Sequence, residues 1–114
     1  MSEKPKIKDT EMYQLLRDDR ISEFNEKKEA GSEFDLTSVD LRGLDLRGLN
    51  TSGIDFTNSY FSQADLRGLN LQACNLEGAS ISGANVSGTY FPAELDATEI
   101  SLSLTHGTRM RYKR

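Results

Sequence analysis

The most regular feature of the sequence is the spacing of its large apolar residues, which recur at every fifth position between residues 34 and 93. Twelve consecutive five-residue units can be written in one register, and the third residue is large and apolar in eleven of them. The exception is Thr51, at the third position of the fourth unit. The residues predicted to form the core are therefore Leu36, Leu41, Leu46, Phe56, Phe61, Leu66, Leu71, Leu76, Ile81, Val86 and Phe91.

A period of five matches neither the 3.6 residues of a helix nor the 2.0 of a strand. Within a unit, however, the first and third residues are two apart and would share one face of an extended segment. Glycine is the fifth residue in seven of the twelve units, where it permits a tight corner. The pattern predicts short extended sides joined by corners and wound into a solenoid, whose stacked turns share one core.

The repeating unit resembles that of the pentapeptide-repeat proteins, whose consensus is A(D/N)LXX. The closest units are VDLRG at 39–43, LDLRG at 44–48, ADLRG at 64–68 and ANVSG at 84–88. The resemblance covers about half the chain and implies an all-β fold, a right-handed quadrilateral β-helix with four units per coil and about three coils. The sequence DLRGLN, which occurs twice at an interval of twenty residues, agrees with that coil length.

The segment before the repeat has its apolar residues at helical spacing. Residues 9–30 predict a helix in two pieces, with Asp19 as the N-cap of the second piece and Gly31 just after its end. We expect this segment to cover the first coil, with Phe24 as its anchor, and we expect residues 1–8 to be disordered.

The segment after the repeat predicts a short helix. Residues 96–99 have the spacing of a capping box, Ile100 and Leu104 are four apart, and Gly107 is placed to end the helix. The predicted organisation is an N-terminal helical cap over 1–33, a β-helix over 34–93, and a C-terminal helix with a basic tail over 94–114.

The last six residues are rich in positive charge. The bases are Arg109, Arg111, Lys113 and Arg114, and Tyr112 lies among them. One interpretation is a frayed or solubilising end, and the other is a flexible cationic arm that binds an acidic patch of a partner protein. Four cations on an acidic protein would bind nucleic acid only weakly and without sequence preference, so we expect no specific nucleic-acid partner.

Two further surface features are candidates for partner contact. Arg47 and Arg67 are one coil apart, beside Asp45 and Asp65, and would form either a self-compensating ladder of charges or a groove for a partner's carboxylates. Tyr60 and Tyr90 occupy outward second positions on opposite faces, where each ring would lie either at an interface or under a capping helix.

Composition restricts the chemistry. The net charge of −4 implies no particular partner, and the only histidine, His106, has no catalytic partner at an interpretable spacing. The repeated Asp and Asn residues suit hydrogen bonds to the corner backbone better than calcium binding, so we expect no metal, no cofactor and no enzyme activity. The lone Cys74, at an inward position, and the lack of an apolar span or signal sequence predict a cytoplasmic protein without a membrane span.

The leading functional prediction is a bacterial adaptor that binds an unidentified acidic protein through its basic tail and repeat surface. The alternative implied by the resemblance is a DNA mimic that modulates a type II topoisomerase such as gyrase. The repeat has three bases and six acids, one net charge per roughly 5 Å of the expected coil axis, whereas duplex DNA has one per ~1.7 Å. The sequence permits either a monomer or a homodimer joined at the C-terminal end.

Overall fold

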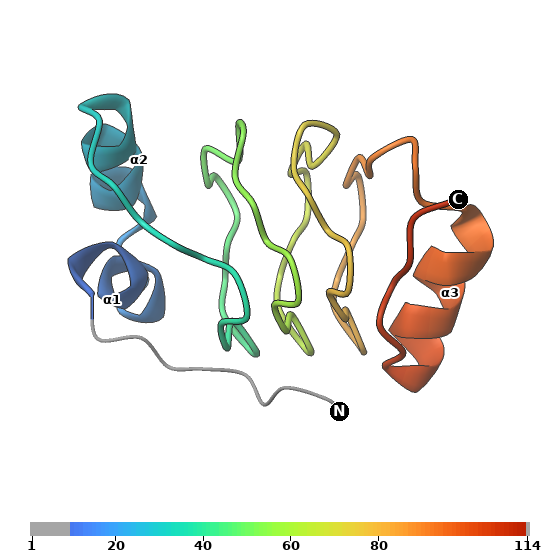
Figure 1. Ribbon diagram of the computed structural model, residues 1–114. Coiled ribbons are helices and arrows are strands. Elements are labelled where there is room, and N and C mark those ends of the chain that lie inside the picture. Colours follow the sequence, from blue (N-terminus) through green and yellow to red (C-terminus); the bar gives the residue numbers. More distant parts are fainter. Residues whose placement is uncertain (1–9, 114) are drawn as a thin grey trace.

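The computed structural model describes residues 10–113 and shows a row of stacked coils with helices at both ends (Figure 1). Helices α1 (Glu11–Arg17) and α2 (Ile21–Glu29) lie at one end, and α3 (Ala97–His106) lies at the other. The prediction for residues 1–8 and the role assigned to Arg114 fall outside the described residues.

The coils stack with a repeat of twenty residues. Parallel bridges join Asp45 to Asp65 and Asp65 to Asn85, and the other bridges have the same offset. One coil therefore takes four units, as the family resemblance implies. Within residues 10–113 these contacts are isolated bridges rather than continuous strands, because each side runs straight for only a few residues before the next corner.

Stacking divides the repeat into four faces, each made of one unit from every coil. Face 1 comprises residues 34–38, 54–58 and 74–78; face 2 comprises 39–43, 59–63 and 79–83; face 3 comprises 44–48, 64–68 and 84–88; and face 4 comprises 49–53, 69–73 and 89–93.

A recurring pattern of backbone hydrogen bonds joins successive coils, and it is complete on face 2. On face 3, Leu66 N donates to Asn85 O at 2.9 Å and Gly68 N donates to Ser87 O at 3.0 Å. In return, Asn85 N donates to Ala64 O at 2.9 Å. Where this pattern is complete, the third and fifth residues of a unit donate toward the following coil, and its first residue accepts. The last coil must satisfy the same groups in some other way.

The predicted core is confirmed for nine of its eleven residues. The fully buried residues are Leu36, Leu41, Leu46, Phe56, Phe61, Leu66, Leu71, Leu76 and Ile81, each at most 2% exposed. Val86 and Phe91, both in the last coil, are only partly buried and pack against this core from its edge. Thr51 is also buried, and its hydroxyl is satisfied because it donates to Asn70 O at 2.6 Å.

The Asp and Asn residues at second positions stabilise the corners, as predicted. Asn70 Oδ1 accepts a hydrogen bond from Gln72 N at 3.0 Å, and the other second-position Asp and Asn residues make the same short-range bond. Glycine is required most clearly at Gly78, where φ is 78° and an added Cβ would lie 2.0 Å from Asn58 Oδ1.

The N-terminal helices cover the first coil. Phe24 is fully buried, and its ring centroid lies 5.3 Å from that of Phe34, which confirms its role as an anchor. The predicted break and the terminating Gly31 are also confirmed. The assignment of Asp19 as N-cap is wrong. Asp19 has a positive φ of 62° in the link between the helices, and Arg20 takes the N-cap position without a side-chain bond.

Two polar side chains complete the hydrogen bonds at this end. Tyr13 donates its hydroxyl to Asp40 O at 2.7 Å. Asn25 donates to Gly48 O at 2.9 Å and accepts from Asn50 N at 2.8 Å. The helices therefore provide hydrogen-bond partners for the coil backbone as well as apolar cover.

Helix α3 covers part of the last coil. Gly107 ends it with a φ of 73°, as predicted. The predicted capping box does not form: Asp96 makes no side-chain cap, and Glu99 Oε1 instead accepts from Arg111 N at 2.9 Å. The inward face of α3 includes Ser103, fully buried, whose Oγ accepts from Ile81 N at 2.9 Å.

Candidate interaction surfaces

The C-terminal residues 108–113, here called the strap, lie extended against the last coil (Figure 1). Met110 is fully buried and donates its N–H to Ala79 O at 2.8 Å. Its carbonyl accepts from Gly78 N at 2.7 Å, so one strap residue takes the place of a further coil. The prediction of a flexible arm is therefore wrong for the described part of the tail, because its apolar residue has a buried site to fill.

The strap is also fixed at Tyr112. The hydroxyl of Tyr112 accepts from Leu76 N at 2.8 Å and donates to Cys74 O at 3.3 Å. Burial raises the pKa of Tyr112, which keeps the hydroxyl protonated and able to donate. Lys113 N donates to Glu94 O at 2.9 Å, so the strap ends beside the segment that leaves face 4.

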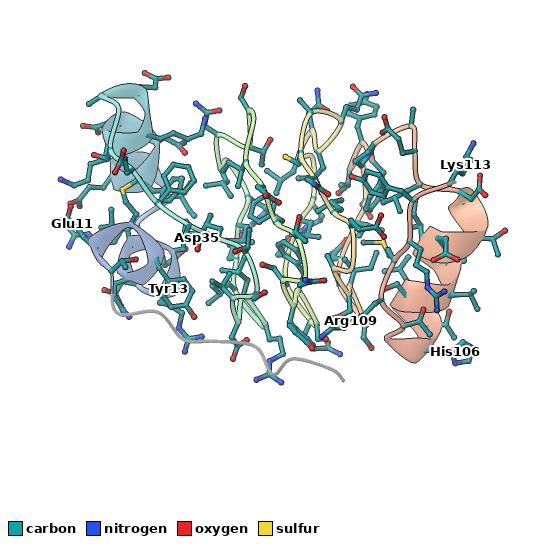
Figure 2. All side chains as sticks on the ribbon, in the orientation of Figure 1. Glu11, Tyr13, Asp35, His106, Arg109 and Lys113 are labelled. Carbon is teal, nitrogen blue, oxygen red and sulfur yellow. The ribbon has the colours of Figure 1, made fainter. Side chains whose placement is uncertain are left out.

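The three described cations of the strap have different surroundings. The guanidinium of Arg109 donates to the hydroxyl of Tyr60 and lies over its ring, while Lys113 Nζ is 3.3 Å from Asp96 Oδ1. Arg111 is exposed, and its side chain has no ion pair within residues 10–113. Figure 2 shows Arg109 and Lys113 at opposite ends of the strap. Among these three cations, Arg111 is the one that is exposed and whose side chain contacts no other described residue through an ion pair or ring.

The two candidate tyrosines differ in exposure. Tyr60 is partly covered by the strap residue Arg109 rather than by a helix. Tyr90 is 61% exposed, the larger of the two exposed fractions among exposed large apolar residues in the described chain. Of the two predicted interface rings, therefore, only Tyr90 is available on the surface.

Arg47 and Arg67 form the self-compensating ladder rather than an open groove. Arg47 bonds Asp45 through Nε at 2.9 Å and Nη2 at 2.7 Å, and Arg67 bonds Asp65 in the same way at 2.9 and 2.7 Å. Arg47 Nε also lies 3.3 Å from Asp65 Oδ2, which links the two coils. The Arg47 guanidinium lowers the pKa of Asp45 to about 2, and Arg67 lowers the pKa of Asp65.

Charge is sorted by face. Arg42 pairs with Asp40 on face 2, and the ladder leaves face 3 neutral. Face 4 contains no Asp, Glu, Lys, Arg or His. The whole net charge of the repeat therefore lies on face 1, at Asp35, Asp55 and Glu77.

Face 4 also contains a surface depression of about 510 Å³ over the first two coils. Its polar lining includes Asn50, Ser52, Asn70 and Gln72. The oxygens of Asn50 and Asn70 are already engaged in the corners, and the lining has no charged group. This surface can therefore offer hydrogen bonds but no ion pair to a bound molecule.

The groups capable of other chemistry are dispersed. His106 is exposed at the end of α3 and projects away from the coils (Figure 2). Cys74 is 6% exposed, its thiol donates to Thr51 O at 3.0 Å, and burial raises its pKa. Among residues 10–113, no three His, Cys, Asp or Glu side chains gather closely enough to hold a metal ion. None of the described helices is long and apolar enough to cross a membrane.

One of three comparisons with known proteins gave a match. Comparison with curated proteins gave no match, and comparison with solved structures gave none either. A family profile described as pentapeptide repeats matches residues 35–72 and 54–91, with eight copies of the repeat. The two matches together span residues 35–91, which is half the chain. The chain belongs to the pentapeptide-repeat family.

Proposed function

We propose that the protein is a non-enzymatic, cytoplasmic module that binds another protein through the surface of a rigid, right-handed coil. The main support is that the described polar side chains of the corners, ladder and caps serve the chain's own structure rather than a reaction. Corner, ladder and cap residues bond the chain's own backbone or one another, and no buried side-chain polar atom among the described residues lacks a partner. Protein interaction is also the typical role of the family.

The partner surface that we propose is acidic and is recognised around Arg111. Arg47 and Arg67 now contribute little, because their N–H groups already bond Asp45 and Asp65. Arg111 is exposed and unpaired within the described chain, so it can bond a partner's carboxylate without first losing an internal ion pair. Tyr90 could add aromatic contact area to the same complex.

The test is affinity capture from bacterial lysate with the intact chain and two charge-reversal variants. Arg111→Glu should lose a stoichiometric acidic partner, whereas Arg17→Glu, an exposed cation at the opposite end on α1, should retain it. Equal recovery by both variants would remove Arg111 from the proposal. Truncation after Gly107 is unsuitable here, because it would also delete the buried Met110.

DNA mimicry of gyrase is the second candidate, and the acidic face 1 is the observation in its favour. Asp35, Asp55 and Glu77 are its only charges and extend over roughly 10 Å, where duplex DNA would have about six charges. This difference makes mimicry the weaker proposal. It predicts that gyrase supercoiling is inhibited by the intact chain and not by Asp55→Asn. No inhibition by the intact chain would exclude it.

A further inference from the structure

The last coil is covered over only half of its backbone edge. On faces 1 and 2, each backbone N–H that would donate to a further coil has a partner. Leu76 N bonds Tyr112, Gly78 N bonds Met110, Ile81 N bonds Ser103 and Gly83 N bonds Leu104. On faces 3 and 4 the equivalent donors are Val86 N, Gly88 N and Phe91 N, and none has a hydrogen-bond partner within residues 10–113. The acceptors Ala84 O and Thr89 O are also unpaired there. We call residues 84–91 the open edge.

Burial independently identifies the same region. Val86 and Phe91 are the two predicted core residues that are only partly buried, and both belong to the open edge. Tyr90, between them on the outer surface, is 61% exposed. An unpaired backbone next to incompletely buried apolar side chains is the arrangement that a further strand would complete.

The open edge also lacks the side chains that usually prevent pairing. Proteins commonly protect exposed edges with lysine, with other charges or with proline. No charged residue occurs between Gly78 and Ala93, and the nearest proline, Pro92, follows the open edge. The opposite end of the solenoid differs, since Tyr13 and Asn25 bond the backbone of the first coil.

We propose that the open edge binds an extended segment of a partner protein, with no net charge, by strand addition. The strap supports this occupant because it pairs with the same coil immediately alongside, through the backbone of Met110 and its buried side chain. The partner segment continues that cover over faces 3 and 4, with small or apolar side chains directed at Val86 and Phe91. The inference rests on the proposed role as a protein-interaction module and specifies one of its binding modes.

The register of the added segment follows from the coils below. Asn85 N donates to Ala64 O, and Leu66 N donates to Asn85 O. By the same rule, the second residue of an added unit donates to Ala84 O and accepts from Val86 N. The second residue of the next unit does the same at Thr89 O and Phe91 N. Gly88 N donates to the carbonyl of the fourth residue of the first added unit, as Gly68 N donates to Ser87 O.

The probe is the chain's own ten-residue sequence ADLRGLNLQA, from residues 64–73, which has no net charge. It is joined to the C-terminus of the full chain by about twelve Gly and Ser residues, which span roughly 19 Å on average. The strap ends beside Glu94, so this linker begins near the open edge. Tethering raises the effective concentration of the probe to the order of millimolar, so a weak site becomes measurable. The matched control has proline at the second and seventh residues of the probe, which removes two of the donors.

The measurement is amide hydrogen exchange by NMR on the parent chain, the fusion and the proline control. The proposal predicts that exchange at Val86, Gly88 and Phe91 slows by about tenfold or more in the fusion only. Equal exchange in the fusion and its control would overturn it. The proposal would also be overturned if exchange at these amides in the parent chain became slower as the protein concentration rises, because a second copy would then occupy the edge. Either failure leaves the capture experiment at Arg111 unaffected, so the two proposals can fail separately.

Discussion

Arg109, on the strap, lies over the ring of Tyr60, with its guanidinium carbon 5.5 Å from the ring centroid, and it donates a hydrogen bond to the tyrosine hydroxyl. Tyr60 belongs to the second coil, so this contact extends past the third coil and joins the C-terminal segment to the middle of the solenoid. The strap is thus held by its side chains as well as by its backbone.

The hydroxyl of Tyr60 should contribute measurably to stability. Tyr60→Phe keeps the ring under Arg109 and removes the hydrogen bond, so we expect the free energy of unfolding to fall by about 0.5–1.5 kcal/mol. Tyr90→Phe is the control, since that residue is 61% exposed and its loss should stay within about 0.5 kcal/mol. Urea unfolding measures both, and equal values for the two variants would contradict the contact.

Removal of the Met110 side chain should be far more costly than removal of its neighbour. Met110 is fully buried, and its replacement by alanine should lower the free energy of unfolding by about 2–5 kcal/mol. Arg111→Ala, at the adjacent exposed position, should change it by less than about 0.5 kcal/mol. A frayed tail would instead give two variants as stable as the parent in the same urea experiment.

The pKa of Asp45 should depend on Arg47. A carboxyl group with a lower pKa in the folded chain stabilises the fold above its unfolded pKa of ~3.9, and this contribution is lost as the pH falls to about 2. Arg47→Ala should raise the pKa of Asp45 from about 2 toward its ordinary value. Arg42→Ala, which breaks the equivalent pair on face 2, should leave it unchanged. Carboxyl carbon NMR titration measures the shift, and an unaltered Asp45 in the Arg47 variant would refute the ladder.

Ser59 should be more important to stability than its polar character suggests. It is fully buried at an inward first position, where its hydroxyl donates to Leu36 O and accepts from Val39 N at 3.2 Å. Ser59→Ala leaves both backbone groups unsatisfied and should cost about 1–3 kcal/mol. Ser62→Ala, in the same unit but only partly buried, should have little effect on the thermal midpoint. Similar midpoints for the two variants would show that Ser59 is not required.

The repeat was predictable because its pattern depends on a regular local rule. Each third residue points inward regardless of what surrounds the coil, so Leu41 and Leu66 could be assigned from spacing alone. The corner bonds of Asp and Asn were predictable for the same reason, since each joins residues only two apart.

The ends were less predictable because their contacts join distant residues. Met110 lies in a short basic segment without periodicity, and its burial depends on the unpaired edge at Gly78 and Ala79. The relevant sequence signal was the pair of non-charged residues, Met110 and Tyr112, that alternate with the bases. Asp96 and Glu99 had the spacing of a capping box, but tertiary contacts with Lys113 and Arg111 took precedence.

The most direct test of the account is amide hydrogen exchange in the unmodified chain, because the central claim is that the last coil is capped on two faces and open on two. We predict slow exchange at Leu76, Gly78, Ile81 and Gly83, whose amides bond the strap and α3. We predict fast exchange at Val86, Gly88 and Phe91, which have no partner within residues 10–113. Fast exchange at Gly78 and Leu76 would show that the strap does not pair with the coil, and this result would contradict the account.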